Sequence, residues 1–270
     1  MKLTSRNYYS KKANRAYFSV SQFKAFMDCE AAAMATLNGE YEPTRGRALL
    51  LGSYVDEMLT GTEASQSKFI IDNENELYKK NGEMYADVLQ ASETIERVKR
   101  QPLMMKYLAG KHQTIMTGEI DGVPFKIKMD SYQPGEYIAD LKYMASLRSP
   151  NLFESFVSYW RYDIQAAAYQ EIVYQNTGKR LPFIFVVATK ENPAHLAVGE
   201  ISQWNMDKAM DVLKGNIARF QKIKSGEIPP ERCEAYDCDF CTSTKVLTEV
   251  VDTDTFGMSR RQMNAMEGVI

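Results

Sequence analysis

The sequence predicts an α/β (α+β) protein in which a helical part precedes a β-sheet. Residues at about 19–110 carry apolar residues at helical spacing, interrupted by a polar loop. Residues at about 111–225 contain shorter apolar or alternating runs bounded by turn signals, which are typical of strands. We therefore expect helices first and a sheet with further helices after them.

The expected elements follow in chain order. Helices of the first part are expected near Ser21–Asn38, Arg45–Leu59 and Glu83–Gly110. Three strands are expected next, near Thr114–Ile120, Val123–Tyr132 and Glu136–Tyr143. Gln133, Pro134 and Gly135 predict a turn, so the second and third strands should form a hairpin.

An amphipathic helix is expected from Leu152 to Thr177. Its apolar positions are Phe153, Phe156, Val157, Trp160, Ile164, Ala168, Ile172 and Val173. Pro182–Thr189 then predicts a buried strand, with Leu196–Ile201 beside it. Asn205 is expected to cap a last helix that ends before Pro229-Pro230. The inward residues of this helix are expected to be Met210, Leu213, Ile217 and Phe220.

The hairpin carries the residues that point to chemistry. Strand side chains alternate in direction, so Asp140 and Lys142 share one face, and Asp130 on the preceding strand can lie across from them. Carboxylates suit Mg²⁺ or Mn²⁺, and a lysine beside such an ion can act on water or offset phosphate charge. An ordinary surface hairpin would explain Asp-x-Lys alone.

The helix after the hairpin adds a polar pair. Gln165 and Tyr169 are four residues apart and therefore share one helical face. Because this helix directly follows the hairpin, its polar pair can lean over the acidic site. The plainer alternative is a helix whose Gln165 and Tyr169 only border the core.

Together these elements resemble the PD-(D/E)XK nuclease superfamily, and within it the RecB-like branch with a Gln-x-x-x-Tyr motif. The resemblance covers about residues 19–245. It implies a restriction-endonuclease-like core, in which a mixed central β-sheet is flanked by helices, plus helical N-terminal additions. Residues 1–270 would form one nuclease domain, with the core at about 111–225, a cysteine-containing segment at 229–245 and a tail at 246–270.

The resemblance also assigns roles. Mg²⁺ or Mn²⁺ would be held by Asp130, Asp140 and the backbone carbonyl of Leu141. Lys142 matches the catalytic lysine, and Gln165 and Tyr169 match residues that support the lysine and contact DNA. Glu119 is a further carboxylate on the strand before the hairpin, either part of the site or simply exposed.

One position departs from the family pattern. The branch carries a Gly-x-x-x-His element whose histidine helps to bind the metal, whereas the matching position after Gly52 is Asp56. Neither of the two histidines, His112 and His195, lies in such an element. An aspartate can bind a hard cation through oxygen, and a helix cap or salt bridge is the alternative role of Asp56.

The four cysteines form a second signal: Cys29, Cys233, Cys238 and Cys241. Their placement near both ends resembles RecB-like nucleases in which an iron–sulfur cluster joins the two ends of the chain. The Cys-x4-Cys-x2-Cys spacing departs from the usual Cys-x2-Cys-x5-Cys of those enzymes. Four thiolates can hold a [4Fe–4S] cluster or Zn²⁺, and we rank the cluster ahead of zinc. Disulfides and unliganded thiols are the alternatives.

Composition constrains the partners. With a net charge of −2, a DNA-binding protein would need a local basic patch, for which Lys128, Arg148 and Arg161 are the candidates. The sequence has no apolar run approaching the roughly 20 residues of a membrane helix, nor a secretory signal. We therefore expect a cytoplasmic protein, encoded by a bacterium or a phage, that does not bind membranes.

The function expected from this resemblance is a metal-dependent exodeoxyribonuclease. It would process the ends of double-stranded DNA for phage-type recombination, with a single-strand annealing protein as partner and a homo-oligomer as the assembly. Two alternatives remain open: a DNA-end-binding accessory protein that has lost catalysis, and a structure-specific endonuclease.

Overall fold

The computed structural model describes residues 1–44, 46–149, 155–247, 250, 252–259, 262 and 266. The chain divides into two compact units. One comprises Met1–Pro43, Glu119–Phe125 and Leu213–Ile270, and the other comprises Thr44–Gly118 and Lys126–Val212. Among the described residues, no helix is long and apolar enough to cross a membrane.

A five-stranded sheet of order β1-β2-β3-β4-β5 forms the centre of the fold. Its strands are β1 (Lys111–Ile120), β2 (Val123–Gln133), β3 (Tyr137–Met144), β4 (Phe183–Thr189) and β5 (Leu196–Glu200). β3 pairs with β2 antiparallel and with β4 parallel, and β4 pairs with β5 antiparallel. The sheet is therefore mixed and carries helices, as the sequence predicts.

The parallel pair β3 and β4 is joined through α9 (Phe156–Tyr159) and α10 (Tyr162–Thr177). The sequence predicts one helix here, but Arg161 adopts a left-handed backbone with φ of 51° and separates the two. A left-handed residue cannot continue a right-handed helix, so α10 begins only after it. Leu152 and Phe153, where the predicted helix starts, lie outside the described residues.

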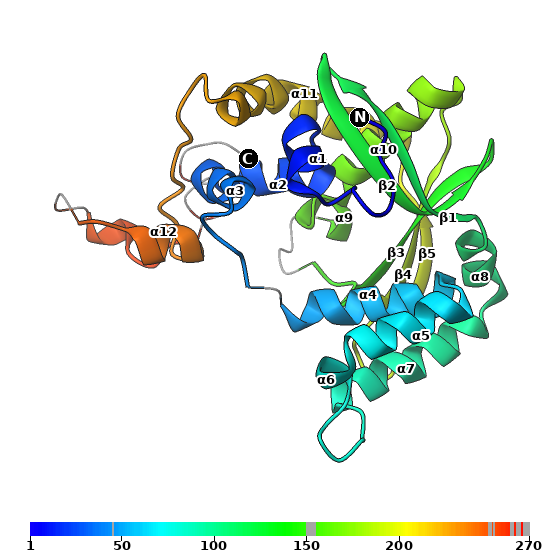
Figure 1. Cartoon of the computed structure of the whole chain (residues 1–270). Helices are drawn as coiled ribbons and strands as arrows, with labels where there is room; N and C mark the ends of the chain where they lie inside the picture. Colours follow the sequence, from blue (N-terminus) through cyan, green and yellow to red (C-terminus); the bar gives the residue numbers. More distant parts are fainter. Residues whose placement is uncertain are drawn as a thin grey trace. The chain divides into compact units, whose positions relative to one another are not determined.

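Helices cover both faces of the sheet, and strand alternation decides which residues meet them (Figure 1). On one face, Tyr137, Ala139 and Leu141 of β3 pack with α4 (Arg47–Thr60), α7 (Ala86–Lys99) and α8 (Pro102–Leu108). The intervening residues of β3 point to the opposite face. There α10 packs on β4, with the Tyr169 and Phe183 rings 6.0 Å apart and the Tyr162 and Phe185 rings 5.8 Å apart. Asp140 and Lys142 thus lie on the α10 face.

The helix predicted over Ser21–Asn38 is two helices, α2 (Val20–Asp28) and α3 (Glu30–Asn38). Cys29 between them is extended, with φ of −162°, and serves as the C-cap of α2 and the N-cap of α3. The helix predicted over Glu83–Gly110 is also interrupted, because Pro102 lacks an N–H and begins α8.

Four short helices lie where the sequence predicts none: α1 (Lys11–Ala16), α5 (Glu63–Asp72), α6 (Glu74–Leu77) and α12 (Asp239–Thr244). None of the residues of α5 is fully buried, so it lacks the apolar stripe by which helices are recognised. Its start is nevertheless fixed by Thr62, whose hydroxyl accepts a hydrogen bond from the Ser65 N–H.

The C-terminal part contains α11 (Gln203–Ser225), α12 (Asp239–Thr244) and a short 3₁₀ turn, η1 (Thr253–Thr255). Asn205 does not cap α11 as predicted. The residue that does so is Ser202, whose hydroxyl accepts a hydrogen bond from the Asn205 N–H at 3.3 Å. Of the residues predicted to face inward, Leu213, Ile217 and Phe220 are buried, whereas Met210 is only half-buried.

Substitution of two glycines by alanine should change the stability of the protein in opposite directions. A β-carbon at buried Gly110 would lie 2.8 Å from the carbonyl carbon of Tyr132, whereas one at Gly215 in α11 meets nothing within 4 Å. We expect Gly110→Ala to destabilise the protein by about 1–3 kcal/mol through overpacking. The matched change Gly215→Ala should stabilise it by about 0.5–1 kcal/mol, because alanine favours the helix. Urea unfolding of both variants measures the difference, and equal effects would contradict the packing described.

Candidate active site

The site begins where β2 and β3 leave their paired register. Ser131 pairs with Ala139, so Asp130 and Asp140 are the next residues along the two strands. One carboxylate oxygen of Asp130, Oδ2, accepts a hydrogen bond from the Leu141 N–H at 3.1 Å. This bond holds the Asp130 carboxylate against the peptide that also carries Asp140.

Asp140, Lys142 and Gln165 form a closed ring of polar contacts. The Lys142 Nζ lies 2.5 Å from Asp140 Oδ2 and donates to Gln165 Oε1 at 3.0 Å. The Gln165 Nε2 donates to Asp140 Oδ1 at 2.5 Å. Since Gln165 lies on α10 and the other two residues on β3, the amide fixes the helix over the charged pair.

Asp140 is almost fully enclosed, with 4% of its side chain exposed. Its Oδ2 atom is buried, and its partner is the Lys142 ammonium group. A buried carboxylate oxygen of this kind retains the capacity to bind a cation.

Lys142 is held as an ammonium ion. Burial lowers its pKa, but the nearby carboxylates of Asp140 and Asp130 outweigh burial and raise the pKa above its ordinary value. The Nζ also lies 4.7 Å from the centre of the Tyr162 ring, where the aromatic face attracts a cation.

Tyr169 connects α10 to β2. Its hydroxyl donates to the Lys128 carbonyl at 3.1 Å, and its ring packs edge-on against Phe183. The residue is buried. In this structure Tyr169 thus fixes the helix that carries Gln165.

Asp56 reaches the same site from α4. Its carboxylate accepts hydrogen bonds from Gln113 Nε2 at 3.1 Å and from the Thr60 hydroxyl at 3.2 Å. Burial raises its pKa to about 6, and the negative charge of Asp140 adds to the rise, against the opposing effect of the Thr60 hydrogen bond.

Asp130 carries a third carboxylate, whose charge interacts with those of Asp140 and Asp56, although among the described residues only the four cysteines bring three or more metal-binding side chains close together. Burial raises its pKa well above the usual range, and Asp140 and Asp56 raise it further. The opposing effects of Lys142 and the Leu141 N–H are smaller. Carboxylate oxygens such as these are the hard donors that suit a divalent cation such as Mg²⁺ or Mn²⁺. We call Asp56, Asp130 and Asp140 the carboxylate cluster.

Comparison with known proteins agrees with this geometry. Residues 19–244 match the family described as "PDDEXK-like domain of unknown function (DUF3799)". The chain belongs to this PDDEXK-like family. It is also similar to the crystal structure of a protein named "Putative exonuclease" from Eubacterium rectale, with 42% sequence identity and a TM-score of 0.86. The match covers 93% of this chain and 97% of that one. None of the curated proteins matches the sequence.

The predicted resemblance to the PD-(D/E)XK superfamily and the predicted fold class are thereby confirmed. The structure brings together the two predicted metal-binding residues, Asp130 and Asp140, and the predicted lysine, Lys142. Their individual roles stay predictions.

The other predicted site residues are not members of the ring formed by Asp140, Lys142 and Gln165. Lys128 is half-buried on β2, and its charge lowers the pKa of Asp56. Arg148 is exposed after β3, where its backbone N–H bonds to Ser146, and Arg161 precedes α10. Glu119 is exposed and belongs to the other compact unit.

Sequence reasoning missed three residues of the PDDEXK-like site: Tyr162, Gln113 and Thr60. Tyr162 had a usable signal, because it lies three residues before Gln165 and thus on the same helical face. Thr60 is likewise four residues after Asp56 on α4. Gln113 gave no signal, since its contact with Asp56 joins residues 57 positions apart in the chain.

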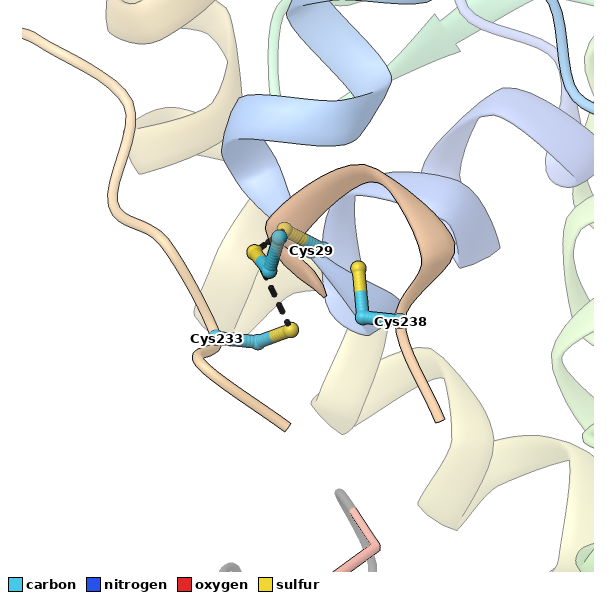
Figure 2. Close-up of side chains that lie close together, drawn as sticks. Cys29, Cys233 and Cys238 are labelled. Carbon is cyan, nitrogen blue, oxygen red and sulfur yellow. Dashed lines mark hydrogen bonds between the residues drawn. The ribbon is translucent and has the colours of Figure 1, made fainter. Parts of the chain in front are cut away.

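The four cysteines also meet, within the other compact unit. Their sulfur atoms all lie within 4.8 Å of one another. Figure 2 shows the side chains of Cys29, Cys233 and Cys238 converging on a common centre. No disulfide joins any of these four cysteines in this structure, so the disulfide alternative is not the arrangement seen.

Burial of the Asp130 carboxylate, together with repulsion from Asp140 and Asp56, should cost stability when no divalent cation is present. The pKa of Asp130 is higher in the folded protein than in the unfolded chain, so the folded protein binds this proton more strongly. The free energy of unfolding should therefore fall as the pH rises from about 4, the pKa in the unfolded chain, through the pKa in the folded protein. We expect Asp130→Asn, which retains an oxygen for the Leu141 N–H, to raise the thermal midpoint in EDTA at neutral pH.

The advantage of the variant should shrink as the pH falls towards 4, because wild-type Asp130 then becomes neutral too. Asp211→Asn, an exposed change on α11, serves as the matched control and should leave the midpoint nearly unchanged. Calorimetry across pH tests this, and a lower midpoint for Asp130→Asn in EDTA would contradict the repulsion.

Proposed function

We propose that this protein is a divalent-metal-dependent deoxyribonuclease that hydrolyses phosphodiester bonds at the ends of double-stranded DNA. The observation that carries the proposal is the ring of Asp140, Lys142 and Gln165 beside Asp130, which combines a cation site with a fixed ammonium group. Membership of the PDDEXK-like family supports nuclease activity. The similar protein named as an exonuclease supports action at DNA ends.

The carboxylate cluster is the part that would hold the cation. Asp130, Asp140 and the Leu141 carbonyl would bind Mg²⁺ or Mn²⁺, with Asp56 as a further oxygen donor in place of the histidine of the family pattern. When bound, such an ion supplies Lewis-acid chemistry, easing deprotonation of water and neutralising phosphate charge.

Lys142 would act on the charge that develops during hydrolysis. Its ammonium group is held beside Asp140 and is charged at neutral pH, because the carboxylates raise its pKa. A fixed cation of this kind stabilises negative charge gathering on the phosphate oxygens, and it can give a proton to the leaving oxygen.

Gln165 and Tyr169 would act as positioning residues. The Gln165 amide contacts both Lys142 and Asp140, so it holds the ammonium and the carboxylate in one geometry. Tyr169 fixes the same helix to β2 through the Lys128 carbonyl. Preorganisation of this type reduces the reorganisation needed during reaction.

DNA would be the partner, with Lys128, Arg148 and Arg161 as candidate phosphate contacts. The family resemblance extends the proposal to phage-type recombination, with a single-strand annealing protein as partner and a homo-oligomer as the working form.

The test compares wild-type protein with Asp140→Asn and Lys142→Ala on linear double-stranded DNA with Mg²⁺, Mn²⁺ or EDTA. We expect cleavage with either metal, and a loss of about 100-fold or more in each variant, because each removes charge stabilisation from the reacting phosphate. Asp211→Asn and Lys214→Ala, both exposed on α11, are the matched controls and should retain activity.

The substrate design separates the competing functions. Labels placed separately at the 5′ and 3′ ends give the direction of digestion, and covalently closed circular DNA detects an endonuclease. Cleavage of circles would replace the exonuclease by a structure-specific endonuclease. If the folded wild-type protein binds DNA ends but cuts no substrate, the protein is a DNA-end-binding accessory protein and not an enzyme. Undiminished cleavage by both variants would refute the site.

A further inference from the structure

The four cysteines are too close together for the cluster that the family resemblance implies. The Cys29 and Cys241 sulfurs are 3.6 Å apart, the Cys233 and Cys241 sulfurs are 3.8 Å apart, and all four lie within 4.8 Å of one another. Four thiolates around one ion with metal–sulfur bonds of about 2.3 Å lie about 3.8 Å apart, which is the edge of that tetrahedron.

A [4Fe–4S] cluster needs a wider site. Each thiolate binds a different iron at a corner of the cube, which sets the sulfur atoms roughly 6 Å apart. A disulfide would instead require about 2.05 Å between two sulfurs. The observed separations fit a single tetrahedral ion.

The backbone around the cysteines is shaped to present the sulfurs inward. Cys29 sits in the extended break between α2 and α3, and its sulfur accepts a hydrogen bond from the Ala32 N–H at 3.5 Å. Glu234, directly after Cys233, has a left-handed backbone with φ of 51°. This turn lets the Glu234 N–H bond to the Cys241 sulfur, while the Cys241 N–H bonds to Cys238.

Such N–H groups favour the thiolate form that metal binding requires. Burial works in the opposite direction and raises the pKa of Cys241 to about 12, with Cys29 and Cys233 adding to the rise.

Arg232 supplies a positive charge beside the cysteines. Its guanidinium donates to the Cys241 carbonyl at 2.8 Å and to the Thr244 hydroxyl at 2.9 Å, and it pairs with Glu234. Four thiolates around a dication carry a net charge of −2. An arginine fixed at this position offsets part of that charge.

We propose that Cys29, Cys233, Cys238 and Cys241 bind one structural Zn²⁺ ion, which joins the start of α3 to the segment around α12, in place of an iron–sulfur cluster. All four ligands are protein thiolates, so the site is closed and its ion has no position for substrate. The site lies in a compact unit that contains none of the carboxylate cluster. The proposal therefore stands independently of the nuclease activity.

The first experiment measures the metal that the full chain carries when it is produced in cells supplied with both iron and zinc and purified without oxygen. We expect about one zinc per chain, with neither stoichiometric iron nor acid-labile sulfide. Iron and sulfide near four each per chain would overturn the proposal, as would protein with four reactive thiols and no metal.

A second measurement on the wild-type chain reports the geometry. Replacement of zinc by Co²⁺ should give the ligand-field and charge-transfer bands of a tetrahedral tetrathiolate site. Octahedral bands, or zinc that mild chelation removes without lowering the thermal midpoint, would show an adventitious ion and refute the proposal.

Variants test the ligand set. Cys241→Ser should lose the zinc and lower the thermal midpoint, whereas Ser243→Ala on the same helix should keep both. If Cys241→Ser fails to fold, stepwise titration of the wild-type thiols with a mercurial reagent decides. Zinc should then be released in step with modification of the thiols, and release without modification would contradict their role.

Discussion

The burial of Asp56, Asp130 and Asp140 near one another is the constraint on which the candidate site depends. Burial raises the pKa of Asp56 and of Asp130, and the negative charge of Asp140 adds to both rises. Lys142 supplies one positive charge, which leaves an excess of negative charge. Evolution tolerates such arrangements mainly at functional sites, where a ligand completes the charge balance. A divalent cation has the charge and the oxygen preference to do so.

The fold brings these charges together through simple geometry. Alternation along β3 sends Leu141 into the apolar face under α4, α7 and α8, and sends Asp140 and Lys142 to the face covered by α10. The end of regular pairing between β2 and β3 places Asp130 beside the Leu141 peptide. Gln165 and Tyr169 then anchor α10 to β3 and β2. The same sheet thus supplies both the apolar core and the charged site.

Short-range patterns predicted much of this, and long-range contacts accounted for what they missed. Alternating and continuous apolar runs, together with turn signals, located all five strands to within a few residues. The Asp-x-Lys and Gln-x-x-x-Tyr spacings selected residues that contact one another in the structure, and their roles stay predictions. The helix interruptions at Cys29 and Arg161 were not predicted, because each depends on the local backbone conformation of one residue. Cysteine spacing could not distinguish zinc from an iron–sulfur cluster, since the distinction lies in distances between sulfur atoms from opposite ends of the chain. The contact of Gln113 with Asp56 could not be predicted either, because the two residues lie far apart in the sequence.

The central claim is that the carboxylate cluster binds a divalent cation. Anomalous diffraction from crystals of the protein soaked in Mn²⁺ tests it most directly, because the signal locates the ion without assumptions about activity. The account predicts a manganese peak within bonding distance, about 2.0–2.3 Å, of Asp130, Asp140 and the Leu141 carbonyl oxygen. Saturating Mn²⁺ that leaves no peak between these groups, or a peak only at remote surface carboxylates, would contradict it.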